Sequence, residues 1–64
     1  MSSFYICMGD QLLVEFSVAH GPWTVERVEH NWARPGESEV HMVRGGDRIV
    51  RRWWWLQKHA RPVS

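Results

Sequence analysis

Residues 39–52 read EVHMVRGGDRIVRR, and this stretch decides the fold. Val40 and Met42 alternate with polar neighbours, as in a strand that buries one of its faces. Gly45 and Gly46 then stand where a tight turn is needed, and glycine accepts a positive φ there without steric cost. The stretch therefore predicts a β-hairpin.

A two-residue turn also fixes which residues of the two strands face each other. Two of the three pairs that it creates join opposite charges, an arrangement that stabilises neighbouring strands. The charge pattern thus supports the hairpin independently of the hydrophobic pattern. The predicted cross-strand pairs are Arg44 with Asp47, Met42 with Ile49, and Glu39 with Arg52.

Turn signals divide the rest of the chain into pieces of strand length. They lie at residues 8–10, 20–22 and 34–37, and with the glycine pair they predict five strands. The first piece alternates apolar residues, and the second has the clearest period of two, so we expect one face of the second strand to line the core. The alternating residues are Phe4, Ile6 and Met8, then Leu12, Val14, Phe16 and Val18.

Two pieces fit a helix as well as a strand. In residues 22–33, Val25 and Val28 are at helical spacing, but the β-rich composition favours a strand with a bulge near Glu26-Arg27. In residues 47–60 the same ambiguity arises, and the hairpin signal favours a strand that continues to about Gln57. The residues at helical spacing in this second piece are Ile49, Trp53, Leu56 and Ala60.

Together these patterns predict one small domain over residues 1–64 that is mainly β. We expect a small antiparallel sheet or open barrel of about five strands, with one short helix as the alternative for an ambiguous piece. A single cysteine cannot close an intrachain disulfide, so aromatic burial or self-association must stabilise so short a chain. We therefore expect a homodimer at micromolar concentration. Cys7, in an apolar run, is expected to be a buried thiol.

The hairpin runs directly into Trp53-Trp54-Trp55. Three adjacent indoles cannot share one face of a strand or one stripe of a helix, so at least one must point away from the core. If the strand continues, Trp53 and Trp55 share the core face with Ile49, and Trp54 is the outward indole.

Charge is unevenly distributed, although the net charge is only +1. Acidic residues concentrate in residues 1–39 and arginines in residues 40–64. The two halves can neutralise each other across paired strands, or they can present separate patches to a partner. Aromatic and basic residues together make the C-terminal end the best candidate for a partner-binding site. We predict that this site comprises Arg48, Arg51, Arg52, Trp54, Lys58 and Arg61.

The sequence offers little support for catalysis or metal binding. Structural zinc sites usually contain a close-spaced pair of ligands, and the four histidines, His20, His30, His41 and His59, include none. The carboxylate pairs Glu26/Glu29 and Glu37/Glu39 flank polar or turn positions and are expected to be solvated. We therefore expect no enzyme activity, no cofactor and no metal.

These patterns favour a binding protein. We expect a protein that occludes or adapts a surface of a larger intracellular machine, of the inhibitor type that phages and mobile elements encode. The alternative is a single-stranded nucleic-acid binder that uses the same C-terminal arginines and tryptophans. The first twenty residues lack the pattern of a signal peptide, and no apolar run reaches the ~18 residues of a transmembrane helix, which favours the cytoplasm.

Overall fold

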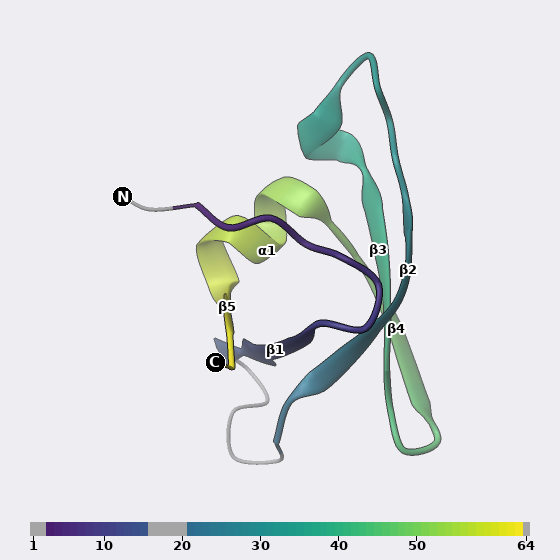
Figure 1. The fold of residues 1–64 in the computed structure, drawn as a ribbon, viewed down its shortest axis with the longest axis vertical. Coiled ribbons are helices and arrows are strands. Elements are labelled where there is room, and N and C mark those ends of the chain that lie inside the picture. Colours follow the sequence, from purple (N-terminus) through teal and green to yellow (C-terminus); the bar gives the residue numbers. More distant parts are fainter. Residues whose placement is uncertain (1–2, 16–20, 64) are drawn as a thin grey trace.

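The computed structural model describes residues 3–15 and 21–63. In this part of the chain, five antiparallel strands form one open sheet in the order β4-β3-β2-β1-β5 (Figure 1). The prediction of a mainly β protein with about five antiparallel strands is confirmed. The elements are β1 (Gln11–Val14), β2 (Trp23–Glu29), the 3₁₀ turn η2 (Pro35–Glu37), β3 (Glu39–Arg44), β4 (Asp47–Arg52), α1 (Trp53–His59) and β5 (Ala60–Pro62).

The β3–β4 hairpin has the predicted register. Glu39 faces Arg52, Met42 faces Ile49, and Arg44 faces Asp47. Within the turn, Gly45 has a φ of 60°, whereas Gly46 does not have a positive φ. A positive φ at the first turn position matches the twist of the two strands and is costly for any residue with a side chain.

The two turn glycines should therefore respond differently to substitution. We expect Gly45→Ala to lower the free energy of unfolding by about 1–2 kcal/mol, because alanine is strained at this φ. Gly46→Ala should leave stability unchanged or raise it by up to about 1 kcal/mol, since no atom crowds that position. Urea denaturation of the two variants measures the difference. Equal losses in both variants would contradict this account of the turn.

The β2 segment is a strand with a bulge, as the sequence predicts. The register with β3 shifts between Val25 and Arg27, so Glu26 is the extra residue. A bulge resets the alternation of side chains by one residue. Val25 and Val28 therefore both face the core, although their spacing does not fit a regular strand.

The prediction of a strand through Gln57 is wrong. The strand β4 ends at Arg52, and the helix α1 begins at Trp53. Leu56 has 0% of its surface exposed and is the buried residue of α1, with Trp53 and Ala60 packed against the same core. Residues three and four apart lie on the same face of a helix. Trp53, Leu56 and Ala60 therefore face the core together and cover part of it. The amide of Trp53, which the helix itself cannot satisfy, donates to the carbonyl of Ser38 at 2.8 Å.

The first piece of the chain is not a strand either. Residues 3–10 run beside α1 as an extended segment and then turn (Figure 1). The side-chain amide of Gln57 bonds both backbone groups of Phe4, at 2.9 and 2.7 Å, and takes the place of a neighbouring strand. The backbone amide of Cys7 donates to the Asp10 carboxylate in the turn. Cys7 is exposed, so the prediction of a buried thiol is also wrong.

The core lies between the sheet, the extended N-terminal segment and α1. Leu12 and Val14 of β1 are buried as predicted, whereas Phe16 and Val18 lie outside the described residues. All five tryptophans are described, and only Trp23 among them is fully in the core. The core residues are Ile6, Leu12, Val14, Trp23, Val25, Val40, Met42 and Leu56.

Candidate functional site

Two of the predicted site residues pair with carboxylates on the outer face of the sheet, which is the face turned away from the core. The Arg48 guanidinium lies 3.2 Å from the Glu26 carboxylate on β2. Arg52 donates to the backbone carbonyl of Glu37 at 2.9 Å and lies 3.7 and 3.8 Å from the carboxylates of Glu37 and Glu39. Here the acidic and basic halves of the sequence neutralise each other, which is one of the two arrangements that the charge pattern allowed.

The other predicted basic residues point elsewhere. Arg51 faces the same side of the sheet as Val40, and its guanidinium carbon lies 5.4 Å from the centroid of a Trp55 ring. Lys58 and Arg61 line an open hollow of about 270 Å³ together with Glu15 and His59, and the His59 ring packs on Trp55. Arg48 and Arg52 therefore lie on the opposite face of the sheet from Arg51, and the five predicted cations do not all share one face.

Trp54 is exposed, as predicted, but for a different reason. The prediction placed it on the outer face of a strand. In the structure the helix directs Trp53 and Leu56 to the core and leaves 45% of Trp54 exposed. Trp54 lies beside η2, since a Cβ atom built on Gly36 would be 3.7 Å from its own Cβ.

A second aromatic surface was not predicted from the sequence. It consists of Tyr5, His30, Trp32 and Trp53, and we call it the aromatic patch. Tyr5 meets Trp53 edge-on with ring centroids 5.3 Å apart, and His30 stacks on Trp32 at 4.5 Å with an interplanar angle of 9°. His30 also lies 6.2 Å from Trp53, which connects the two pairs. Tyr5 and Trp32 are 67% and 78% exposed, so the patch faces solvent.

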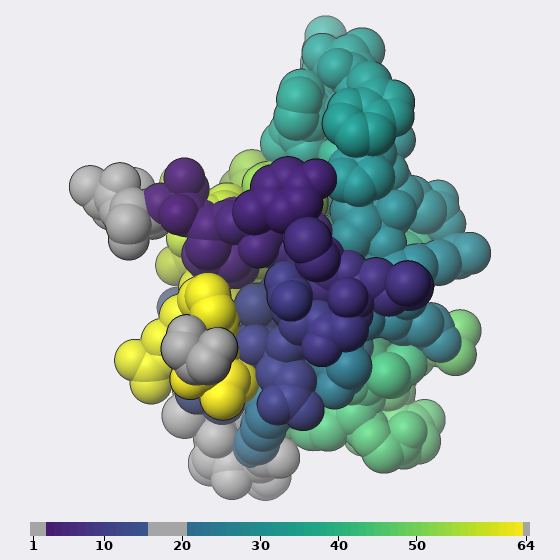
Figure 2. Space-filling model, in the orientation of Figure 1, coloured from purple at the N-terminus to yellow at the C-terminus, as the bar shows by residue number. Residues whose placement is uncertain are grey.

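The patch lies where the N-terminal segment meets the loop between β2 and β3. Figure 2 shows these two segments, in purple and teal, side by side on one face of the molecule. A mainly apolar hollow of about 80 Å³ opens between them, lined by the four patch residues with Pro35 and Ser38. A wider hollow of about 310 Å³ shares Tyr5 and His30 and extends to Met8, which is itself exposed.

Hydrogen bonds hold the loop that carries Trp32. The hydroxyl of Ser38, a buried residue, accepts from the backbone amide of Asn31 at 2.9 Å. The Asn31 side chain in turn accepts from the backbone amide of Arg34 at 3.0 Å. Because the Ser38 carbonyl also accepts the Trp53 amide, one residue fixes both the loop and the start of α1. These bonds hold the backbone on both sides of Trp32 without the help of a partner, which lowers the entropy cost of binding there.

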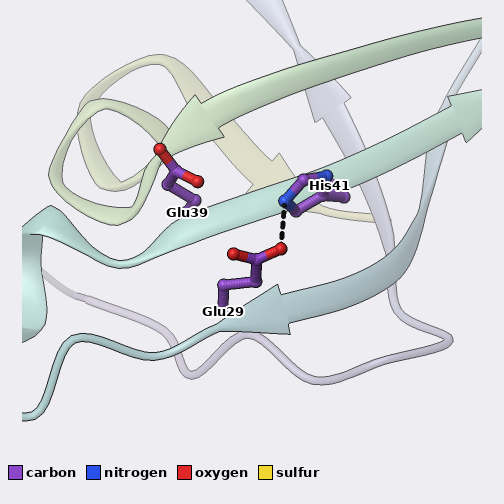
Figure 3. A group of neighbouring side chains, drawn as sticks. All are labelled: Glu29, Glu39 and His41. Carbon is purple, nitrogen blue, oxygen red and sulfur yellow. Dashed lines mark ion pairs between the residues drawn. The ribbon is translucent and has the colours of Figure 1, made fainter.

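The fold also gathers a group that the histidine spacing did not indicate. Glu29 on β2 and Glu39 and His41 on β3 place one ligand atom each within 4.8 Å of one another (Figure 3). Sequence reasoning missed this group because its members are joined by strand pairing: Glu29 faces Glu39, and His41 faces Arg27. A search along the chain for close-spaced ligands cannot detect such an arrangement.

No helix in the described part of the chain is long and apolar enough to cross a membrane. Comparison with protein-family models, with curated proteins and with solved structures gives no significant match.

Proposed function

We propose that this protein is a non-enzymatic binding protein that occludes or adapts a surface of a larger intracellular machine, with the aromatic patch as its contact surface. The observation that carries the proposal is the solvent exposure of Tyr5 and Trp32 within one ordered cluster. Small domains need their aromatic residues for burial, and clustered aromatic residues left in water mark interaction sites. Tryptophan and tyrosine are also the residues on which binding energy concentrates.

Single-stranded nucleic acid is the second candidate partner. The stacked His30 and Trp32 rings favour it, because bases stack on exposed aromatic rings. Electrostatics favour a protein. A nucleic-acid surface needs cations directed at phosphates, whereas Arg48 and Arg52 each lie beside carboxylates of the same chain. We therefore rank a protein partner first.

The exposed thiol of Cys7 supports placing the protein in the cytoplasm, where thiols stay reduced. The proposal is tested by capture on the immobilised chain from two samples of host lysate, one treated with nuclease and one untreated. We expect one recurring protein to be retained at moderate salt. Retention that disappears after nuclease treatment would favour the nucleic-acid alternative instead.

Trp54→Ala tests whether the contact surface extends from the aromatic patch across η2, because Trp54 lies beside η2 and Pro35 of η2 lines the patch hollow. Trp54 is half-exposed, so we expect the variant to fold, and we expect binding to weaken by ~2 kcal/mol. Calorimetric titration gives the affinity, and thermal unfolding serves as the control for the fold. A variant that unfolds would show that Trp54 belongs to the core, and a folded variant with unchanged affinity would exclude Trp54 from the contact surface.

A further inference from the structure

The outer face of the sheet carries a three-residue group that shares no residue with the aromatic patch. The imidazole Nε2 of His41 lies 3.3 Å from a carboxylate oxygen of Glu29, and Figure 3 shows the two side chains directed at each other. Glu39 lies on the same face, directly opposite Glu29 in the strand register. Its carboxylate is within 4.8 Å of both other ligand atoms.

The His41 nitrogen is buried without a hydrogen bond. Only 13% of the His41 side chain is exposed, and Nε2 itself has no solvent contact. Although the Glu29 oxygen is close, the ring nitrogen makes no hydrogen bond to it. The two atoms form an ion pair if His41 is protonated, whereas a neutral ring whose Nε2 carries no proton leaves this buried nitrogen in need of another partner. A cation held between the nitrogen and the oxygen would satisfy both atoms.

The separation of these two atoms fits a tetrahedral metal ion. Zinc binds histidine nitrogen and carboxylate oxygen at about 2.0–2.1 Å, so two of its ligand atoms lie about 3.3–3.4 Å apart in tetrahedral geometry. The measured separation of His41 Nε2 and the Glu29 oxygen is 3.3 Å. The Glu39 side chain is 42% exposed, and one of its carboxylate oxygens lies within 4.8 Å of both atoms.

The charges of the neighbouring residues agree with a bound cation. Two carboxylates directly opposite each other on adjacent strands repel. Arg27 lies 2.7 Å from the oxygen of Glu29 that faces His41, whereas Arg52 is shared between Glu37 and Glu39 at 3.7 and 3.8 Å, so Glu39 is the less neutralised of the two carboxylates. A carboxylate oxygen has two lone pairs, so this Glu29 oxygen can accept from Arg27 and bind an ion at the same time.

We propose that Glu29, Glu39 and His41 form a binding site for a divalent transition-metal ion of the zinc type. One imidazole and two carboxylates supply three ligands, and water completes the tetrahedron. A mixed nitrogen and oxygen ligand set selects against Mg²⁺, which requires six oxygen ligands.

The test is calorimetric titration of the full chain with zinc chloride, with magnesium chloride as the comparison. We expect one zinc ion per chain and no saturable magnesium binding. Replacement of a residue that only supports a ligand commonly costs about 10–100-fold in metal affinity, so loss of a ligand should cost at least about tenfold. We expect this loss in Glu29→Gln, Glu39→Gln and His41→Gln. The two glutamate variants alter half-exposed side chains, and circular dichroism confirms that each variant is folded.

His59→Gln is the matched control, because His59 also lies 3.1 Å from a carboxylate, that of Glu15, but outside the group. This variant should bind zinc like the parent chain. Absence of saturable zinc binding in the parent would overturn the proposal. Zinc binding that survives in His41→Gln or Glu39→Gln, or that is lost in His59→Gln, would also overturn it.

Discussion

Leu56→Ala is expected to lower the free energy of unfolding by about 2–5 kcal/mol, which approaches the whole stability of a domain of this size. Leu56 is completely buried and is the only fully buried residue of α1, while Trp53 and Trp55 pack against the edge of the same core. Its removal leaves a cavity that the helix cannot fill by a small shift, because Trp53 and the Ser38 carbonyl fix where the helix begins. Thermal and urea denaturation measure the loss.

Val50→Ala is the matched control for this prediction. Val50 is an apolar residue on the outer face of β4 and is exposed, so its truncation should cost less than about 1 kcal/mol. The comparison of Leu56→Ala with Val50→Ala also tests whether residues 53–59 form a helix. In the strand that the sequence favoured, Leu56 would lie on the same face as the exposed Trp54 and its loss would cost little. Similar stabilities for the two variants would contradict the burial of Leu56.

Trp32→Ala is expected to weaken binding of the retained partner by about 2–4 kcal/mol, or roughly 30- to 1,000-fold, and to leave the fold intact. Trp32 is the most exposed tryptophan and stacks on His30 outside the core, so it contributes little to the core. In a complex, its ring would bury a large apolar area within an ordered cluster. Calorimetry measures the affinity, and circular dichroism confirms the fold.

Lys58→Ala is the comparison variant for Trp32→Ala. Lys58 belongs to the basic site predicted from the sequence and lines a different hollow. If the aromatic patch is the contact surface, Lys58→Ala should bind almost like the parent chain. A larger loss in Lys58→Ala than in Trp32→Ala would favour the C-terminal basic surface.

Light scattering on both variants would show whether the expected homodimer uses the patch, because only Trp32→Ala would then become monomeric.

The parts of the fold that depend on residues close together in the sequence could be predicted from the sequence. The β3–β4 hairpin depends on its own alternation, its turn and its charge pairs, and all three predicted pairs are present. The bulge in β2 follows from local composition in the same way. The segment from Trp53 to His59 was ambiguous because its apolar spacing suits a helix while its aromatic residues suit a strand. The contact of Leu56 with the distant core resolves this ambiguity in favour of the helix.

Less of the candidate site could be predicted, since it is assembled from distant segments. The adjacency of three indoles requires one of them to point outward, but the choice of Trp54 depended on a strand where the structure has a helix. The neutralisation of Arg48 by Glu26 requires the pairing of β2, β3 and β4. Tyr5 and Trp53 meet where Gln57 binds the backbone of Phe4 and Ile6 enters the core, contacts that hold the N-terminal segment beside α1. No local pattern encodes that contact.

Photo-crosslinking in the host cell tests the central claim, that the aromatic patch is the surface through which this protein binds a protein partner. A photoreactive amino acid replaces Trp32 in one variant and Val50, on the outer face of the sheet, in the other. We predict that position 32 crosslinks to one recurring protein and that position 50 does not. Equal crosslinking from both positions, or crosslinks from position 32 only to nucleic acid, would contradict the claim.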